Sequence, residues 1–226
     1  MTGVARLAVV LGVCLSFSQA SEVAGRIVLQ KDLGKGSVAP ITYDLRGLAV
    51  GDSASNQRPV NKFERVALWL ESDHPAAVEP VMVTMRQRNR HFEPELLVVP
   101  VGSTVEFPNL DFIFHNIFSL SRTQTFDLGY YPKGQSRSVT FRHPGIVQVY
   151  CHVHANMHGA IVVTSSRWFG KPAEDGAFVF ANVPRGKYRL MVWQRFGGLY
   201  QKNIEVQGTE DVKITMTVPE QDEDRP

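Results

Sequence analysis

Residues 146–163 read IVQVYCHVHANMHGAIVV, and this stretch decides the fold of the 226-residue chain. The run 146–151 alternates between two faces, because successive strand side chains point to opposite sides of a sheet. One face is apolar and ends at Cys151, which therefore points into a core. The run 159–163 is apolar again, so the chain must turn back between the two strands. The sequence predicts two strands joined by a short polar turn over residues 152–158.

Three metal-binding side chains gather at this turn: Cys151, His154 and Met157. Thiolate and thioether are soft ligands and imidazole is intermediate, a set that suits copper alternating between Cu(I) and Cu(II). Zinc more often takes four strong ligands from Cys, His or carboxylate. A second histidine would complete the set, and His115 in the segment 110–118 is the best candidate, since a neighbouring strand end can bring it in. These four residues are the predicted ligands of one copper ion.

The rest of the chain shows short alternating segments separated by Gly, Pro, Asn and Asp. No stretch has a sustained helical period. The clearest predicted strands are 25–29, 66–70, 81–85, 103–107, 138–141, 146–151, 159–163, 176–180, 187–193 and 212–218. Strands at this spacing indicate an all-β protein built as sandwiches or barrels.

The first 20 residues are typical of an export signal. Arg6 precedes an apolar run that ends in Ser18-Gln19-Ala20, a small-x-small cleavage pattern. The run is shorter than the roughly 20 apolar residues of a spanning helix, so we expect no membrane span. The chain is therefore expected to be periplasmic or secreted after cleavage near Ala20, with a charged tail at 221–226.

Cleavage after Ala20 would remove Cys14 and leave Cys151 as the one cysteine, which excludes a disulfide scaffold. A lone thiol in an oxidising compartment needs burial or a use. Losing Arg6 takes Lys plus Arg from 24 to 23 against 22 Asp plus Glu, and this balance predicts no nucleic-acid partner. The sequence also carries none of the common hydrolase, metalloprotease, phosphate-loop or dithiol motifs, so we expect a protein that is not an enzyme.

The segment from about 81 to 163 resembles the cupredoxins, the blue copper proteins. The Cys-x2-His-x2-Met spacing is similar to the short ligand loop of amicyanin. The other matching features are an aromatic residue before the cysteine, a glycine after the loop and a run leading to a His-Asn pair: Tyr150, Gly159, 105–109, His115 and Asn116. The loop departs from amicyanin at Ala155, where proline is usual, and in its additional histidines 152 and 158.

This resemblance implies a Greek-key sandwich over residues 79–165 that holds one type 1 copper ion and passes single electrons between redox partners. It implies that Asn116 ties the ligand loops together beside the metal. Of the two histidine ligands, it implies that His154 is the one facing solvent.

A second resemblance covers residues 175–193, where Asp-Gly-x-Phe and Val-Pro-x-Gly-x-Tyr turns resemble the carboxypeptidase regulatory-like β-sandwich. It implies a second prealbumin-like or Ig-like sandwich formed by residues 21–75 and 166–220, with the domain 79–165 inserted between them. Two consecutive domains are the alternative. This second module carries no chemical groups of its own, so a structural or partner-docking role is expected.

Other chemistry-bearing residues have simpler interpretations. His152 and His158 are expected to face solvent, although either could compete for the metal. Solvent exposure or ordinary packing is expected for three further histidines, three alternating arginines and four methionines: His74, His91, His143, Arg86, Arg88, Arg90, Met82, Met85, Met191 and Met216. A docking patch for an acidic redox partner is the alternative for the arginines.

Two other classes of function stay open. A copper chaperone or storage module would use the same donors without redox turnover, and a structural adhesion module would bind no stoichiometric copper. Reversible one-electron cycling with an intense thiolate-to-copper colour distinguishes an electron carrier from both.

Overall fold

The computed structural model describes residues 20–31, 61–75, 77–208 and 212–220. Within these ranges the chain forms strands and one short 3-10 helix, η1 (Lys62–Arg65), so the all-β prediction is confirmed. No helix in this described part is long and apolar enough to cross a bilayer. The expected export signal, apart from Ala20, and the charged tail lie outside the described residues.

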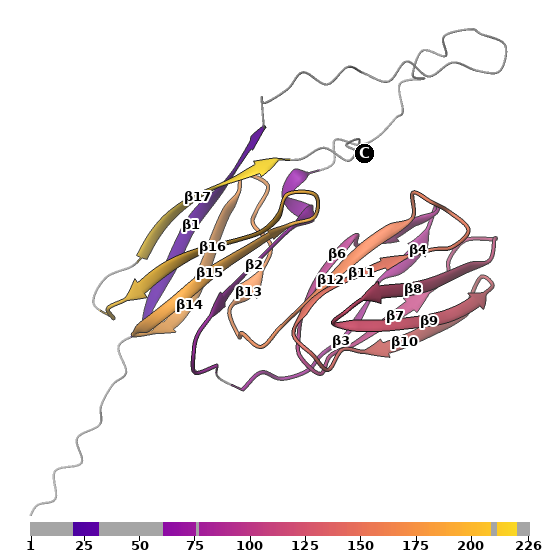
Figure 1. Ribbon diagram of the computed structural model, residues 1–226, viewed down its shortest axis with the longest axis horizontal. Helices are drawn as coiled ribbons and strands as arrows, with labels where there is room; N and C mark the ends of the chain where they lie inside the picture. The colour runs from indigo at the N-terminus through magenta and orange to yellow at the C-terminus, as the bar shows by residue number, and fades with distance from the viewer. Residues whose placement is uncertain (1–19, 32–60, 76, 209–211, 221–226) are drawn as a thin grey trace, which may run out of the picture.

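The strands form two bodies that lie side by side (Figure 1). We call the first the terminal sandwich, because it takes strands from both ends of the described chain. Its two sheets have the orders β14-β1-β17 and β13-β2-β15-β16. The strand bounds are β1 (Ala20–Lys31), β2 (Val66–Glu71), β13 (Phe169–Gly170), β14 (Ala177–Pro184), β15 (Gly186–Gln194), β16 (Gly198–Val206) and β17 (Val212–Glu220).

The second body, which we call the central sandwich, contains the ten strands between β2 and β13. Its sheets have the orders β6-β12-β11-β8-β9 and β10-β7-β3, and β4 and β5 form a two-stranded hairpin. The bounds are β3 (Met82–Thr84), β4 (Arg86–Arg88), β5 (His91–Glu93), β6 (Leu96–Pro100), β7 (Thr104–Pro108), β8 (His115–Ser121), β9 (Gln124–Tyr131), β10 (Ser136–Thr140), β11 (Gly145–Tyr150) and β12 (His158–Thr164).

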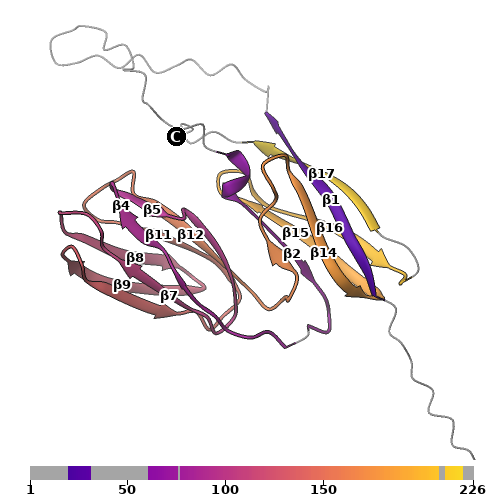
Figure 2. The same cartoon turned by 180° about the vertical axis from the view of Figure 1, so that it is seen from behind.

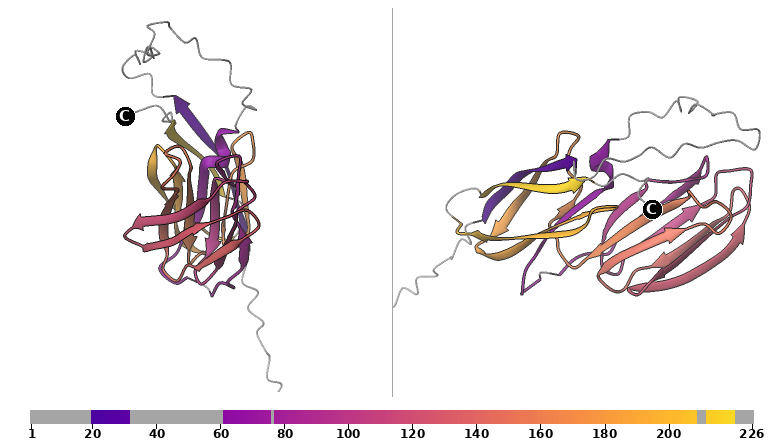
Figure 3. Two further views of the ribbon diagram at one scale, coloured as in Figure 1. Left: turned by 90° about the vertical axis from the view of Figure 1, so that its right-hand side faces the viewer. Right: turned by 45° about the horizontal axis from the view of Figure 1, so that its top comes forward.

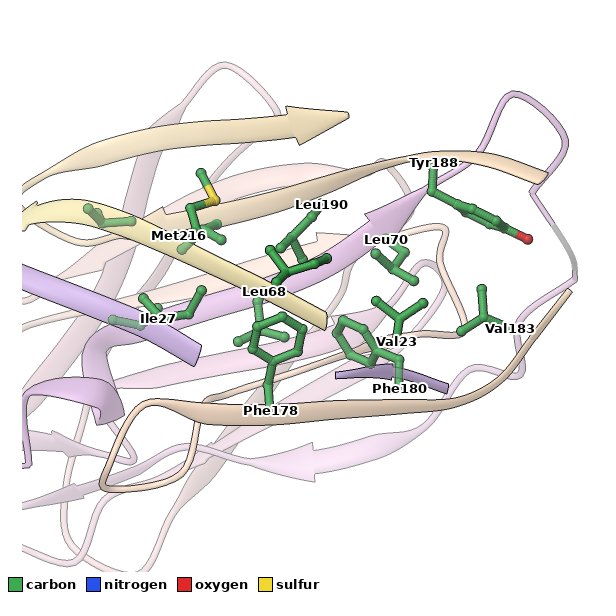
Figure 4. Packing of buried hydrophobic residues seen from close by; sticks show 14 of the residues in the cluster. Val23, Ile27, Leu68, Leu70, Phe178, Phe180, Val183, Tyr188, Leu190 and Met216 are labelled. Atoms are coloured by element: carbon green, nitrogen blue, oxygen red, sulfur yellow. The ribbon is translucent and has the colours of Figure 1, made fainter. Parts of the chain in front are cut away.

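The terminal sandwich is closed by its first strand. β1 pairs antiparallel with β14 and parallel with β17, so three distant parts of the chain share one sheet. Inward side chains such as Ile27, Leu68 and Leu190 pack into an apolar core between the two sheets (Figure 4). Burial of these side chains, each at most 1% exposed, stabilises the pairing of segments far apart in sequence.

The central sandwich is organised around β11 and β12. These strands pair antiparallel from Gly145 opposite Val163 to Tyr150 opposite His158, which leaves residues 151–157 as the turn between them. The side chains of Val147 and Val149 are fully buried, as the alternation predicts, and Cys151 lies in the same core cluster.

The two bodies share a third apolar cluster. It joins Trp69, Met191 and Trp193 of the terminal sandwich to residues on β6 and β12 of the central one. Figures 2 and 3 show the two bodies lying against each other in further views. The pairing of β1 with β14 and β17 supports the predicted division into 21–75 with 166–220 and an inserted 79–165. That division stays a prediction.

Each of the ten predicted strands overlaps a strand of the structure, but seven strands were missed. The missed strands are β4, β5, β6, β8, β9, β13 and β16. Two of them break the alternating pattern for identifiable reasons. β8 opens with the buried polar pair His115-Asn116, and β9 carries Asp127 and a glycine, Gly129, with positive φ.

Candidate metal centre

His115, Cys151 and His154 form the one group of three or more potential metal ligands found among the described residues. One donor atom from each lies within 4.8 Å of the other two. The Cys151 Sγ atom is 3.7 Å from Nδ1 of His115 and 3.7 Å from Nδ1 of His154. The structure thus brings together three residues that the sequence places up to 39 positions apart.

The backbone of the turn fixes this arrangement. The N–H of Cys151 donates to the carbonyl of Met157 at 3.1 Å, and the N–H of Met157 donates to the carbonyl of His154 at 2.9 Å. The turn is followed by Gly159, where a Cβ atom would come within 3.1 Å of the Glu95 carbonyl oxygen. A larger residue there would push β12 away from Glu95, so glycine allows the two backbones to approach.

Met157 is buried, with 1% of its surface exposed, and belongs to the same core cluster as Cys151. The turn therefore places the fourth predicted donor residue inside the sandwich beside the cysteine and not on the surface. Its assignment as a ligand remains a prediction.

His115 is oriented by a carboxylate that the sequence analysis missed. The Nε2 atom of the fully buried His115 lies 2.9 Å from Oδ2 of Asp111. When Nε2 carries the hydrogen and donates a hydrogen bond to this carboxylate, the lone pair of Nδ1 faces Cys151. The only signal in the sequence is an acid four residues before the histidine, which is too common to single out.

Asp111 is itself held by the turn between β4 and β5. Its two carboxylate oxygens accept the N–H of Asn89 at 2.6 Å and of Arg90 at 2.8 Å. Both turn residues have positive φ, 52° and 61°. Partial burial raises the pKa of Asp111, but the donors from Arg90, His115 and Asn89 outweigh burial, so its pKa lies below the usual value. The carboxylate is therefore charged at neutral pH.

His154 occupies the solvent side of the group and is half-buried. Its ring centroid is 4.9 Å from that of His115, with 60° between the ring planes. Partial burial, followed by the nearby His115 and Arg90, lowers the pKa of His154 below the usual histidine value. The neutral imidazole, which is the metal-binding form, is favoured.

Asn116 links the strand of His115 to the turn. Its amide oxygen accepts the N–H of His152 at 2.8 Å, and its Nδ2 donates to Asp127 at 3.2 Å. These bonds tie together the two segments that carry the histidines and the cysteine, which is the place that the resemblance implies for this residue. Its role beside a metal stays a prediction.

The two additional histidines of the turn behave differently. The side chain of His152 is 46% exposed, as predicted, and stacks on Phe118 with ring centroids 3.8 Å apart. The prediction for His158 was wrong, because its side chain is only 15% exposed and lies against Glu95 and Phe196. The error arose because Glu95 from a neighbouring segment and Phe196 from the other body cover this residue, and strand alternation shows neither contact.

The remaining surface predictions are confirmed. The histidines outside the turn are exposed, as are the three arginines of the β4–β5 segment, and the four methionines divide between core and surface: His74, His91, His143, Arg86, Arg88, Arg90, Met82, Met85, Met191 and Met216.

The donor set fits a copper ion. Sulfur and imidazole nitrogen bind first-row metals at roughly 2.0–2.3 Å, and donors spread evenly around such an ion lie about 3.7 Å apart. The two S to N separations of 3.7 Å match that spacing. One thiolate and two imidazoles, with the buried Met157 on the same turn, favour copper over zinc.

No known protein-family model matches the chain. Part of the chain is similar to solved structures of copper proteins. A copper-containing nitrite reductase from Thermus scotoductus SA-01 is 30% identical over 40% of this chain, with a TM-score of 0.36, and the match spans a quarter of the enzyme's length. The P94F mutant of amicyanin in the reduced state is 26% identical over 43% of this chain and 98% of its own, with a TM-score of 0.35. A purple cupredoxin from Nitrosopumilus maritimus is 26% identical over 36% of this chain and 96% of its own, with a TM-score of 0.33.

Proposed function

We propose that this chain is a periplasmic or secreted cupredoxin that holds one type 1 copper ion and carries single electrons between redox partners. His115, Cys151, His154 and Met157 would be its ligands, and Asn116 would tie the ligand segments together. The protein would not catalyse a reaction of its own, and it would use neither nucleic acid nor a membrane span.

One observation carries this proposal. A buried cysteine sulfur lies 3.7 Å from an imidazole nitrogen on each of two histidines, and a buried methionine closes the same turn. A structural cysteine in a core is normally surrounded by apolar side chains. Two imidazole nitrogens aimed at one thiol are instead typical of a metal site.

Copper would supply the one-electron chemistry, cycling between Cu(I) and Cu(II). The Cys151 thiolate would provide the strongest ligand bond, and His115 and His154 would complete the set of strong ligands. Met157 would be a weaker ligand that tunes the reduction potential. Asp111 and Asn116 hold His115 and the turn in place, so little rearrangement would accompany a change of charge at the site.

A partner would approach from the His154 side. His154 is the more exposed of the two histidines, and the loop before His115 carries Phe112, Ile113 and Phe114, which are exposed, as is Val153 of the turn. Such a cluster of exposed apolar side chains is unusual for a free surface. We propose that a redox protein docks over it and exchanges electrons through His154.

The test is an absorption spectrum of the copper-loaded mature protein beside Cys151→Ser and His154→Ala. The unsubstituted protein is expected to bind one copper per chain, to show an intense thiolate-to-copper band and to cycle reversibly by one electron. Cys151→Ser is expected to lose the band. His143→Ala removes an exposed histidine outside the site and is expected to keep the band unchanged.

Two outcomes would contradict the proposal. Stoichiometric Cu(I) without colour or reversible cycling would indicate a chaperone or storage module. No stoichiometric copper in the unsubstituted protein would indicate a structural module.

A further inference from the structure

A cluster of charged side chains joins the two sandwiches next to the turn 151–157, which carries three of the proposed copper ligands and is called the copper turn below. Its centre is Glu95, which precedes β6 of the central sandwich. Glu95 Oε2 accepts the Nε–H of Arg65 at 2.9 Å, and Oε1 lies 3.5 Å from Nη1 of Arg195. Both arginines belong to the terminal sandwich, one at the end of η1 and one directly after β15. Two cations of one body therefore converge on a single anion of the other.

The cluster is shielded from water. The exposed side-chain fractions are 23% for Arg65, 25% for Glu95 and 8% for Arg195. Phe196 forms one wall, with the guanidinium of Arg65 at 5.6 Å and that of Arg195 at 5.4 Å from its ring centroid. Charge pairs at low exposure are screened less than surface pairs, and their geometry is held more firmly.

The same carboxylate reaches the copper turn. Glu95 Oε1 lies 3.7 Å from Nε2 of His158, and the ring of His158 meets Phe196 edge to face at 6.4 Å between centroids. His158 directly follows Met157 and starts β12 opposite Tyr150, the residue before Cys151. The carbonyl of Glu95 also accepts the N–H of Ala160 at 2.8 Å. The contacts of Glu95 therefore act on His158, the residue that directly follows Met157.

We propose that Glu95 is a positioning residue for the copper site, through which the terminal sandwich sets the placement of Met157. Arg65 and Arg195 hold the carboxylate, the carboxylate and Phe196 hold His158, and His158 fixes the backbone that presents Met157. The terminal sandwich, for which the sequence predicts a structural or docking role, thereby acts on the copper site through its two arginines. This proposal rests on the proposed copper function.

The matched pair of variants is Glu95→Gln and Glu71→Gln. Both remove a carboxylate charge that faces an arginine, but Glu71 pairs with Arg189 inside the terminal sandwich, 3.3 Å away, and does not touch the turn. The copper-loaded proteins are compared by the relative heights of their thiolate-to-copper bands and by reduction potential. A weak axial ligand affects both quantities, whereas a purely structural contact affects neither.

Glu95→Gln is expected to bind one copper per chain with a changed band ratio and a shifted potential, while Glu71→Gln matches the unsubstituted protein. If Glu95→Gln fails to fold, Phe196→Leu serves instead, because it removes the edge contact to His158 and keeps all charges. A lower melting temperature with an unchanged spectrum and potential would overturn the proposal and leave the cluster as an adhesive between the bodies. Absence of the band in the unsubstituted protein would overturn the copper function itself, which separates the two failures.

Discussion

The two sandwiches differ in what they bury. The core of the terminal sandwich is formed by aliphatic and aromatic side chains and by Met216, with Tyr188 as its most polar member. Within the described part of the chain, the terminal sandwich buries three polar residues, Ser21, Ser166 and Gln194, whereas the central sandwich buries a histidine, three amides, two serines and a threonine: Gln87, Ser103, Asn109, His115, Asn116, Ser119 and Thr164. Buried polar groups cost free energy unless they are hydrogen-bonded, so their concentration in one body requires a reason.

The reason is visible in the bonds of Asn109. Its Nδ2 donates to the carbonyls of Ile113 and Tyr131, and its Oδ1 accepts the N–H of Asp111. Asp111 in turn bonds to His115. The buried polar groups of the central sandwich thus shape the loop before His115, one of the predicted ligands. The terminal sandwich is stabilised mainly by apolar packing. The central sandwich replaces part of its apolar packing with buried hydrogen bonds, which hold the His115 segment in a fixed geometry.

The largest expected effect is a loss of stability from a substitution in the apolar core of the terminal sandwich. Leu190→Ala leaves a cavity in the terminal core, where Leu190 is fully buried, and should lower the free energy of unfolding by about 2–5 kcal/mol. Denaturant unfolding measures this loss. Leu199→Ala, at a half-exposed position of the same sandwich, is the control and should cost much less. Loss of copper colour by Leu190→Ala under conditions where the protein is still folded would contradict the expectation that this apolar core acts on stability alone.

A smaller effect is expected on copper binding from a substitution of Asp111 in the central sandwich. Asp111→Asn can still accept a hydrogen bond from His115 but removes the charge, so copper(II) should bind about 10–100-fold more weakly and the reduction potential should rise. The sign follows because the lost negative charge stabilises Cu(II) more than Cu(I). Copper competition and redox titration measure both, with Asp175→Asn on the terminal sandwich as the control. An unchanged potential would show that the carboxylate does not act on the site.

Tyr131 tests the polar core through pH. Its hydroxyl donates to the carbonyl of Phe107 at 2.8 Å and accepts from Gln87 at 2.6 Å. Tyr131→Phe should cost about 1–2 kcal/mol of stability at neutral pH. Burial raises the pKa of Tyr131 above its ordinary value. Its contribution is therefore present below about pH 10, where the unfolded tyrosine ionises, and is lost as pH rises further.

Unfolding measured between neutral and strongly alkaline pH checks this prediction. Tyr130→Phe, at the exposed neighbouring position, is the control and should be close to the unsubstituted protein throughout. If the free energy of unfolding fell equally with rising alkaline pH in the unsubstituted protein and in Tyr131→Phe, the role assigned to the burial of Tyr131 would be ruled out.

The smallest effect is expected at the edge of the central sandwich. Arg88 lies 4.0 Å from Glu93, and both side chains are about half exposed. Arg88→Gln should change stability by less than about 1 kcal/mol, because water and salt screen such a pair. Thermal melting at low and high salt measures it. A loss as large as that of Tyr131→Phe would mean that this edge is more than a solvated surface.

Much of the site could be predicted because its chemistry is local. The alternation that ends at Cys151 shows which way the thiol points, and the spacing to His154 and Met157 places three donors on one turn. His115 could be chosen only by its type and neighbours, since nothing in the sequence measures a distance across a sheet. Asp111 could not be chosen at all, because its role depends on a turn of two positive-φ residues that lie 21 and 22 positions earlier.

The sequence by itself determined that the chain is all-β and that one turn carries soft metal donors, and it predicted that both ends of the chain contribute to one sandwich. Period-two alternation and turn residues are local properties that a short stretch expresses in full. Tertiary structure decided which carboxylate holds His115 and that the terminal sandwich covers His158. The Asp111–His115 contact joins residues only four positions apart, but it depends on the folded central sandwich, which buries His115 and brings the turn at Asn89 and Arg90 against Asp111. The cover over His158 comes from segments far apart in the chain, and the part that Phe196 provides exists only after the two bodies have packed together.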